Sequence, residues 1–232
     1  MNDKCILLFV KYPEKGRIKK RLDSGIKNID VVELYKNFVF DTLLTLNKIK
    51  TKFYVCFYPA DSEIKFIEWL GEKYFYMSQD GLDLGDRMKN CFIKAFSRNF
   101  KRVIVIGSDA PDLPCEYIKY AFASLESHDA VIGPAADGGY YLLGFNFDKF
   151  APEIFKGIEW STDKVFKDTL AVLDKSKRKT YILPEWNDID VREDIINFIK
   201  RNKDSKNGYL RTFSYLSKHK LLTSFDSPLS GG

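Results

Sequence analysis

The sequence predicts an α/β protein built on one mostly parallel β-sheet, and three observations lead to this class. Runs of apolar, β-branched and aromatic residues alternate along the chain with segments of helical periodicity, an order typical of βαβ units. The run 103–106 is apolar throughout, as strands covered on both faces are. The 232 residues contain no internal repeat and no interior linker rich in Pro, Gly or Ser, so one main domain is expected.

In the first half of the chain, four apolar runs bounded by turn residues predict strands at 5–10, 52–58, 74–78 and 103–106. A helix is expected over 30–49, because its apolar residues fall mostly on one face and Asp30 can act as its N-cap. A short helix capped by Asp61 should end near Trp69, with Gly71 closing it. A further helix is predicted over 86–98, after a loop at 79–85.

In the second half, a helix should follow Pro114 and run to about Ser127. Strands are predicted at 129–133, 139–145 and 180–183. Ser161 or Thr162 is expected to cap a helix, and the closing helix covers 191–201. Residues 1–201 are therefore expected to form the main domain. Residues 202–232 are expected to form an appendage or tail, with a short amphipathic helix within 209–222.

Composition narrows the classes of function. The formal net charge of +5 suits an anionic small molecule as well as nucleic acid, but no motif of the usual nucleic-acid-binding modules is present, so no nucleic-acid partner is expected. The four cysteines are widely spaced, without a CxxC pair or a Cys/His cluster, which predicts free thiols in a reducing, cytoplasmic setting. No apolar run approaches the ~20 residues of a membrane span. Neither His128 nor His219 belongs to a recognisable catalytic triad.

The most informative stretch follows strand 103–106, where the chain turns into Gly107, Ser108 and Asp109. In an open α/β sheet, ligands bind outside the carboxyl ends of the strands, so Asp109 is a carboxylate delivered to the expected site. Asp112 lies three residues further on. A hard cation such as Mg²⁺ takes one or two carboxylates together with substrate phosphates. Alternatively, both aspartates only cap the next helix and complete the turn.

The loop after the first strand, residues 11–21, carries six cations and a single interior glycine. It matches neither the Walker loop nor the dinucleotide fingerprint, so phosphates would be held mainly by side chains. Arginine offers a planar fork and lysine a point charge for this purpose. The alternative is a solvated basic loop without a ligand. The candidates for phosphate binding in this loop are Lys11, Lys15, Gly16, Arg17, Lys19, Lys20 and Arg21.

Asp137, Gly138 and Gly139 lie between two predicted strands. Glycines allow a ligand to approach the backbone closely, which would make Asp137 a second carboxylate near the site. An Asp-Gly pair between two β-runs is also a strong signal for a hairpin turn, and the spacing alone favours the turn.

Asp188 and Asp190 lie between the last strand and the closing helix. Alternate residues of an extended segment face the same side, so both carboxylates could reach one metal ion. The competing interpretation, which the residues alone favour, is that Asp190 caps the helix and Glu193 completes a capping box.

Several of these segments occur in the same order as the motifs of a known family. They are 9–22, 81–88, 107–114 and 133–144, followed by 160–162 and 188–190. Over about residues 5–200 the chain resembles a bacterial family of GT-A-like transferases. That family was first described as a domain of unknown function and is regarded as a family of glycosyltransferases. It is related to nucleotide-diphospho-sugar transferases and to the molybdenum-cofactor and phospholactate guanylyltransferases.

The resemblance implies the GT-A (nucleotide-diphospho-sugar transferase) fold for residues 1–201, with a single mixed, mostly parallel sheet and helices on both faces. It implies Mg²⁺ or Mn²⁺ as cofactor, with Asp109 as the principal metal carboxylate and Asp190 or Asp188 as the second. Where the family usually has Lys-Thr-Arg in the first loop, this chain has Lys-Lys-Arg at 19–21, which exchanges a hydroxyl for a charge.

The resemblance also assigns roles to the remaining candidates. Besides Asp109, it implies a catalytic role for Lys19 and Arg21. The residues expected to bind the nucleotide and its phosphates are Lys11, Lys15, Gly16, Arg17, Lys20, Gly85, Arg87 and Ser108. The residues expected on the acceptor side are Asp137, Gly138, Gly139 and Tyr140.

Two functions are consistent with these residues. The leading hypothesis is a Mg²⁺-dependent transferase that moves a glycosyl or nucleotidyl group from a nucleotide sugar or nucleoside triphosphate to a small-molecule acceptor. The metal and the basic loop would neutralise charge on the phosphates, so catalysis would be mainly electrostatic and positional. The alternative is a non-catalytic protein on the same fold that binds a nucleotide or phosphometabolite, because fold does not fix function.

Overall fold

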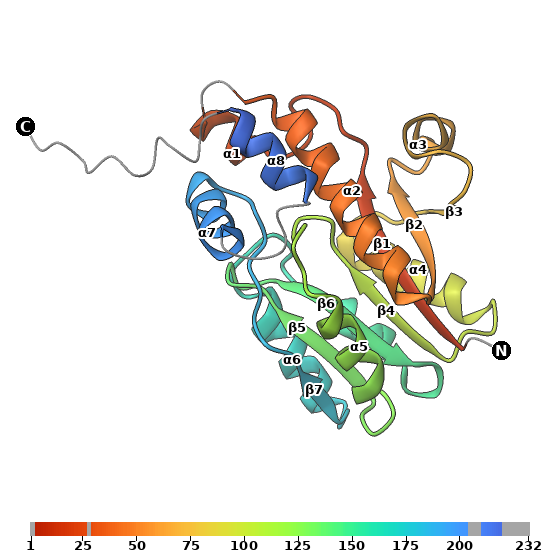
Figure 1. The fold of residues 1–232 in the computed structure, drawn as a ribbon. Helices are drawn as coiled ribbons and strands as arrows, with labels where there is room; N and C mark the ends of the chain where they lie inside the picture. Colours follow the sequence, from red (N-terminus) through yellow and green to blue (C-terminus); the bar gives the residue numbers. More distant parts are fainter. Residues whose placement is uncertain (1–2, 27–28, 204–209, 220–232) are drawn as a thin grey trace, which may run out of the picture. The chain divides into compact units, whose positions relative to one another are not determined.

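The computed structural model of the chain describes residues 3–26, 29–203 and 210–219 (Figure 1). The chain divides into two compact units, and each is described by itself. The first unit comprises residues 1–12, 45–108 and 114–187, and the second comprises residues 13–44, 109–113 and 188–232.

The described residues of the first unit form a seven-stranded sheet with the order β3-β2-β1-β4-β6-β5-β7 (Figure 1). The strands are β1 (Lys4–Lys11), β2 (Lys52–Tyr58), β3 (Phe75–Ser78), β4 (Arg102–Ile106), β5 (Ala130–Pro134), β6 (Tyr140–Asn146) and β7 (Thr180–Ile182). Strand β6 runs antiparallel to its neighbours β4 and β5, and the other neighbouring strands are parallel. The predicted single, mixed and mostly parallel sheet is confirmed.

The helices are divided between the two units. The first unit contains α3 (Glu63–Leu70), α4 (Leu84–Phe96), α5 (Cys115–Ser124), α6 (Val165–Lys175) and the short 3₁₀ helices η1 (Phe147–Lys149) and η2 (Pro152–Phe155). The second unit contains α1 (Lys20–Gly25), α7 (Arg192–Asn202) and α8 (Arg211–Lys218). Helix α2 (Val31–Ile49) begins in the second unit and ends in the first.

Helices of the first unit cover both faces of the sheet. On one face, Cys5 of β1, Phe92 of α4 and Leu173 of α6 belong to one buried cluster. On the other face, the ammonium of Lys4 lies 5.6 Å from the ring centroid of Phe122 in α5. Side chains alternate along a strand, so Lys4 and Cys5 point to opposite faces. The predicted arrangement of helices on both faces is therefore confirmed.

Strand β4 occupies a central position between β1 and β6. Residues 103–106 are buried throughout, which explains why no polar residue alternates with the apolar ones in this run. The strand ends at Ile106, and the chain reaches Asp109 three residues later.

Three predicted helix starts in the first unit differ from the structure, those of α3, α4 and α6. Helix α3 has Ser62 at its N-cap position, not Asp61. Helix α4 begins at Leu84, two residues earlier than predicted, because the carboxylate of Asp83 accepts a 2.8 Å hydrogen bond from the backbone N–H of Asp86. Such a side-chain cap satisfies a backbone donor that the first helical turn leaves free.

Helix α6 also begins later than predicted, at Val165 with Lys164 at the N-cap position. Ser161 has a φ of 68°, a left-handed backbone rather than the β-region backbone typical of N-cap residues, and it precedes the N-cap residue Lys164 by three positions. The hydroxyl of Thr162 instead donates to the carbonyl of Glu159 at 2.8 Å. Neither of the two predicted caps therefore starts the helix.

In the second unit, Asp30 caps α2 as predicted, since its carboxylate accepts a 2.9 Å hydrogen bond from the N–H of Val32. Helix α8 is fixed to α2 by the buried Asp41, whose carboxylate accepts 2.8 Å hydrogen bonds from the N–H groups of Arg211 and Thr212. Burial raises the pKa of Asp41, and the two backbone donors oppose this shift.

The helix predicted within 209–222 corresponds, among the described residues, to α8. Residues 204–209 and 220–232 of the predicted appendage lie outside the described residues. The boundary at residue 201 between a transferase domain and a tail stays a prediction. All four cysteines are free thiols. Among the helices of the described residues, none has both the length and the apolar composition needed to cross a membrane.

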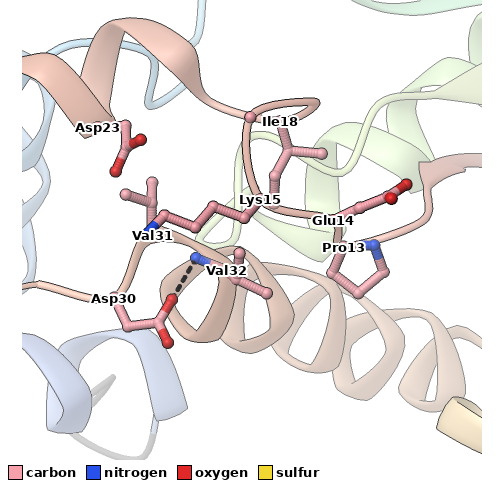
Figure 2. Close-up of a pocket in the computed structure, with 9 residues that line it drawn as sticks. Pro13, Glu14, Lys15, Ile18, Asp23, Asp30, Val31 and Val32 are labelled. Carbon is pink, nitrogen blue, oxygen red and sulfur yellow. Dashed lines mark hydrogen bonds between the residues drawn. The ribbon is translucent and has the colours of Figure 1, made fainter.

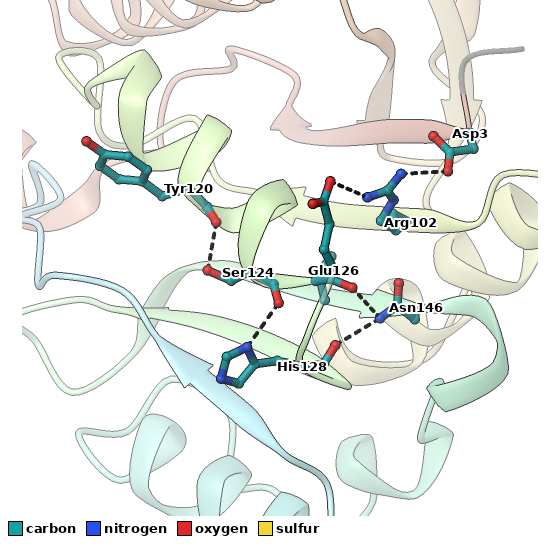
Figure 3. A network of polar contacts seen from close by, with 8 residues as sticks. Asp3, Arg102, Tyr120, Ser124, Glu126, His128 and Asn146 are labelled. Carbon is teal, nitrogen blue, oxygen red and sulfur yellow. Dashed lines mark hydrogen bonds and ion pairs between the residues drawn. The ribbon is translucent and has the colours of Figure 1, made fainter.

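His128 has a structural place in the first unit (Figure 3). Its Nδ1 lies 3.0 Å from the carbonyl oxygen of Ser124 at the end of α5. Its own carbonyl accepts a 2.9 Å hydrogen bond from the side chain of Asn146 in β6. In the same view, Arg102 of β4 pairs with Asp3 at 2.8 Å. These contacts fix the ends of α5, β4 and β6 to one another.

Candidate functional site

Of the six cations that lie within residues 11–21, one lysine points inward and the other five are exposed. The exposed residues are Lys11, Lys15, Arg17, Lys20 and Arg21, of which the last two belong to the first turn of α1. The side chain of Lys19 is only 4% exposed. Lys19 also has a left-handed backbone with φ 44° and ψ 42°. For a residue other than glycine this conformation costs about 1–2 kcal/mol, so surrounding contacts must hold it.

The ammonium of Lys19 lies between two of the predicted carboxylates. Its Nζ is 2.7 Å from Oδ1 of Asp109 and 2.7 Å from Oδ1 of Asp190. Burial lowers the pKa of Lys19, but the charges and hydrogen bonds of the two aspartates outweigh it, so the pKa is raised above its ordinary value. Lys19 is therefore a cation. The cluster carries one positive and two negative charges.

The segment that carries Asp109 is anchored from two directions. The carbonyl of Asp109 accepts a 2.9 Å hydrogen bond from the N–H of Ile189. The carboxylate of Asp112, 2% exposed, accepts hydrogen bonds from Nε and Nη2 of Arg201 at 2.5 and 2.8 Å. It also accepts one from the side chain of Asn202 at 2.7 Å. Segment 109–113 is thus held both to the chain before α7 and to the end of α7.

The structure bears on the alternative interpretation of Asp109 and Asp112 as caps of the next helix, and the metal role stays a prediction. The N-cap position of α5 is occupied by Pro114, and no side chain caps that helix. The prediction that the two aspartates serve as helix caps is therefore wrong. Asp112 is used in a buried ion pair, and Asp109 is used in the contact with Lys19.

The start of α7 leaves the carboxylate of Asp190 available to Lys19. Helix α7 has Val191 at its N-cap position, and the carboxylate of Asp194 accepts hydrogen bonds from the N–H groups of Asp190 and Val191 at 2.8 and 2.9 Å. The predicted capping by Asp190 with Glu193 is therefore wrong by one residue, because the acidic residue three positions after the N-cap is Asp194.

The two carboxylates suit a hard divalent cation in number and in exposure. The side chains of Asp109 and Asp190 are 40% and 37% exposed. Mg²⁺ is usually held by one or two carboxylates, with water and substrate phosphates as the other ligands. Among the described residues, no group of three or more His, Cys, Asp or Glu side chains is arranged around a metal site. Two carboxylates lie within the number that Mg²⁺ takes from a protein where substrate phosphates and water supply its other ligands.

A pocket of about 530 Å³ lies beside the same loop in the second unit (Figure 2). It is lined by Pro13, Glu14, Lys15, Gly16, Ile18, Asp23, Asp30, Val31 and Val32. Its volume lies in the range of small-molecule sites, about 300–1,000 Å³. Three of the lining side chains are acidic and one is a lysine, so the pocket suits a neutral or cationic group better than a phosphate.

Two predicted nucleotide-binding residues of the first unit lie near Tyr58, one as its strand neighbour and one in contact with its ring. Tyr58, at the end of β2, is the register partner of Lys11 at the end of β1. The guanidinium carbon of Arg87 lies 4.2 Å from the centroid of the Tyr58 ring, a cation–π contact. Arg87 of α4 therefore covers the ring of Tyr58 at the carboxyl end of β2, where the neighbouring strand β1 ends in Lys11.

Gly85 and Ser108, also in the first unit, are both buried. Gly85 lies in the first turn of α4, where a Cβ atom would be 2.5 Å from the indole ring of Trp160. Trp160 thus packs directly on the helix backbone, and only glycine leaves room for it.

Residues 135–139 form the hairpin turn that the spacing favours. The N–H of Ala135 donates to the carbonyl of Gly139 at 3.0 Å, and the N–H of Gly139 donates to the carboxylate of Asp137 at 2.9 Å. The turn joins the antiparallel strands β5 and β6. Tyr140 packs against the core of the first unit, and burial raises the pKa of its hydroxyl. The acceptor-side role of these residues stays a prediction.

We expect Gly138→Ala to lower the free energy of unfolding by about 2–5 kcal/mol. Gly138 has a φ of +87°, and a Cβ atom there would lie 2.1 Å from the carbonyl oxygen of Asp163. The left-handed backbone costs an alanine about 1–2 kcal/mol, and overpacking adds about 1–3 kcal/mol. Urea denaturation measures the loss.

Gly157→Ala is the matched control, because Gly157 has a φ of +71° with open space around the position of a Cβ atom. Only the backbone cost of about 1–2 kcal/mol is expected there. Equal losses for the two variants would contradict the close packing of the turn against Asp163.

The sequence does not predict the roles of Arg201 and Asn202. A basic residue in the last turn of a helix is common because it complements the helix dipole. Arg201 is 89 residues away from its partner Asp112 in the sequence. The residues that flank Arg201 and Asp112 give no sign that these two form an ion pair. The carboxylate that follows a buried strand is visible in the sequence, but the side chains that support it are not.

Comparison with known proteins shows the family to which the chain belongs. Residues 42–162 match the family described as "Uncharacterized protein conserved in bacteria (DUF2064)". The structure of a "putative nucleotide-diphospho-sugar transferase" from Desulfovibrio desulfuricans G20 is similar to this chain, with a TM-score of 0.92 and 40% sequence identity. The match covers 97% of this chain and 98% of that one. No match is found among curated proteins.

Two more distant structures share the fold alone. The 4-diphosphocytidyl-2C-methyl-D-erythritol synthase from Anaerococcus prevotii DSM 20548 has a TM-score of 0.56 and 12% identity, with 93% of this chain and 97% of that one covered. The CMP:2-keto-3-deoxy-manno-octonic acid synthetase complexed with CTP has a TM-score of 0.54 and 9% identity, with 85% and 97% covered. The chain belongs to the bacterial DUF2064 family and has the fold of nucleotide-diphospho-sugar transferases.

Proposed function

We propose that the chain is a metal-dependent transferase that acts on a nucleotide sugar or a nucleoside triphosphate. The transferred glycosyl or nucleotidyl group would pass to a small-molecule acceptor. The fold and the 40% identity to the Desulfovibrio protein support the transferase class. The observation that carries the proposal is the convergence of Asp109 and Asp190 on the buried Lys19, next to a loop of exposed cations.

Asp109 and Asp190 would hold Mg²⁺ or Mn²⁺ in this proposal, and Asp190 is preferred to Asp188 because of its contact with Lys19. When bound, the ion would neutralise negative charge on the phosphates of the donor. The remaining contribution comes from the chain itself. The exposed cations Lys15, Arg17, Lys20 and Arg21 would bind and orient those phosphates.

Taken by itself, the first unit contains a cation–π contact between Arg87 and Tyr58, and a guanidinium on an aromatic ring suits a planar, anionic group. The acidic and apolar pocket beside Lys15 suits a part of the substrate that carries hydroxyl groups.

A thermal-shift screen against nucleoside triphosphates and nucleotide sugars tests the proposal. The melting temperature is expected to rise with one class of nucleotide, and to rise further when Mg²⁺ or Mn²⁺ is added. A ligand at ~100-fold excess over its dissociation constant stabilises the folded state by ~2.7 kcal/mol. The nucleotide that shifts the melting temperature is then assayed for release of nucleoside diphosphate or pyrophosphate in the presence of candidate acceptors.

The outcomes separate the two functions. A metal-dependent shift together with release of product supports the transferase. A shift without turnover for any acceptor favours the nucleotide-binding protein on the same fold. Folded protein that responds to no nucleotide in the presence of either metal would contradict both the donor class and the proposed site.

A further inference from the structure

The ammonium of Lys19 occupies the point at which the two metal-binding carboxylates of the proposed function converge. Its distances of 2.7 Å to Asp109 and Asp190 are those of charge-assisted hydrogen bonds. A Mg²⁺ ion binds carboxylate oxygens at about 2.0–2.1 Å. An ion on the same two oxygens would therefore touch the ammonium and be repelled by its charge. The ammonium and the divalent ion exclude one another at these atoms.

Lys19 is held at this point from more than one side. Its side chain is 4% exposed, so the ammonium has little water to replace the carboxylates. Its Nζ also lies 5.7 Å from the ring centroid of Phe38, a cation–π contact on the side of α2. The other cations of the loop are exposed. Lys19 can leave the carboxylates at low cost only where another anion receives it.

We propose that Lys19 is an internal counter-ion that competes with the divalent cation for Asp109 and Asp190, so that metal binding depends on the phosphates of the substrate. In the free protein the ammonium offsets part of the negative charge of the two carboxylates and keeps their affinity for the divalent ion low. Phosphates bound at the loop offer the ammonium a new anionic partner and release the carboxylates. Metal and phosphate then raise each other's affinity, as reciprocal coupling requires. This inference rests on the proposed function.

Binding of Mn²⁺ alone, followed by the electron paramagnetic resonance signal of the free ion, tests the competition. Lys19→Met removes the charge and keeps a long, flexible side chain. We expect it to raise the affinity for Mn²⁺ by roughly tenfold or more, within the range of couplings between sites. Lys19→Arg retains the charge and should stay near the wild type. Lys200→Met, an exposed lysine of the same unit, controls for the change in net charge.

A second measurement uses the wild-type protein and inorganic pyrophosphate as the phosphate probe. Water-proton relaxation, which responds to protein-bound Mn²⁺, is expected to increase when pyrophosphate is added. Asp109→Asn in the Lys19→Met background should remove the gain in Mn²⁺ affinity, which assigns the ion to these carboxylates.

The outcomes distinguish this inference from the proposed function. If folded Lys19→Met binds Mn²⁺ no more tightly than the wild type, the proposed competition between Lys19 and the metal ion is overturned. If Asp109→Asn abolishes the Mn²⁺ binding of the wild type in the same experiment, the proposed metal site is still supported. If Lys19→Met does not fold, equal Mn²⁺ binding by the wild type with and without pyrophosphate overturns it instead. If no variant binds Mn²⁺ with or without pyrophosphate, the metal-dependent function itself fails, and the inference with it.

Discussion

Asp109→Asn is expected to reduce the turnover number of the proposed transferase by about 10²–10³-fold, the loss typical of removing one electrostatic group from a catalytic site. Asparagine keeps the shape of the side chain but removes one of the two charges that would hold the divalent ion. Donor binding should weaken much less, because the exposed cations of the loop are unchanged. The residue is partly exposed, so the fold should tolerate the change.

The measurement compares turnover with the thermal-shift titration of the donor. Asp148→Asn is the matched control, since it makes the same chemical change at an exposed residue of η1. Its turnover should stay close to that of the wild type. A variant of Asp109 that lost binding and turnover in equal proportion would indicate a role in substrate binding alone.

The same comparison separates the two candidates for the second carboxylate. Asp190 shares the contact with Lys19 and should resemble Asp109 when it is replaced by asparagine. Asp188→Asn is expected to have the smaller effect. The opposite order would move the second carboxylate of the metal site two residues along the extended segment, from Asp190 to Asp188.

The fold could be predicted from the sequence largely because its strands are covered on both faces. The run 103–106 in β4 is apolar throughout and is buried throughout, so the pattern and the environment agree. The ends of the helices were less predictable. Ser161 is a residue type that often caps helices, but it has a left-handed backbone in the turn before α6, and the helix begins only at Val165. Cap identity depends on backbone angles that composition does not specify.

Only those features of the candidate site that depend on neighbouring residues in the sequence could be predicted. A carboxylate directly after a buried strand is visible in the sequence, and Asp109 is such a residue. The loop has several cations, however, and nothing in the order of residues shows that Lys19 is the one turned inward. Its partner Asp190 is 171 residues away, and its left-handed backbone is maintained by that contact and by the one with Asp109. Long-range pairing therefore determines which charge is buried.

Arg201→Met is expected to lower the free energy of unfolding by about 3–5 kcal/mol, the cost of removing one partner from a buried ion pair. The carboxylate of Asp112, 2% exposed, would keep the hydrogen bond from Asn202 but lose both bonds from the guanidinium. Replacing both partners, in the double variant Asp112→Leu and Arg201→Met, also removes the buried carboxylate. The double variant should therefore be more stable than Arg201→Met alone. Asn202 retains a hydrogen bond to the carbonyl of Phe198 at 2.8 Å.

Urea denaturation of the three proteins measures these differences, and Arg17→Met provides the control. Arg17 pairs with Glu14 at 3.2 Å, but both side chains are more than half exposed, so its loss should cost at most about 1 kcal/mol. The buried pair with Asp112 holds segment 109–113 to α7, and Asp109 lies on that segment. Arg201→Met should therefore also weaken Mn²⁺ binding in a Lys19→Met background. A stability loss no larger than that of Arg17→Met would show that water reaches Asp112 and that the position of Asp109 does not depend on the pair.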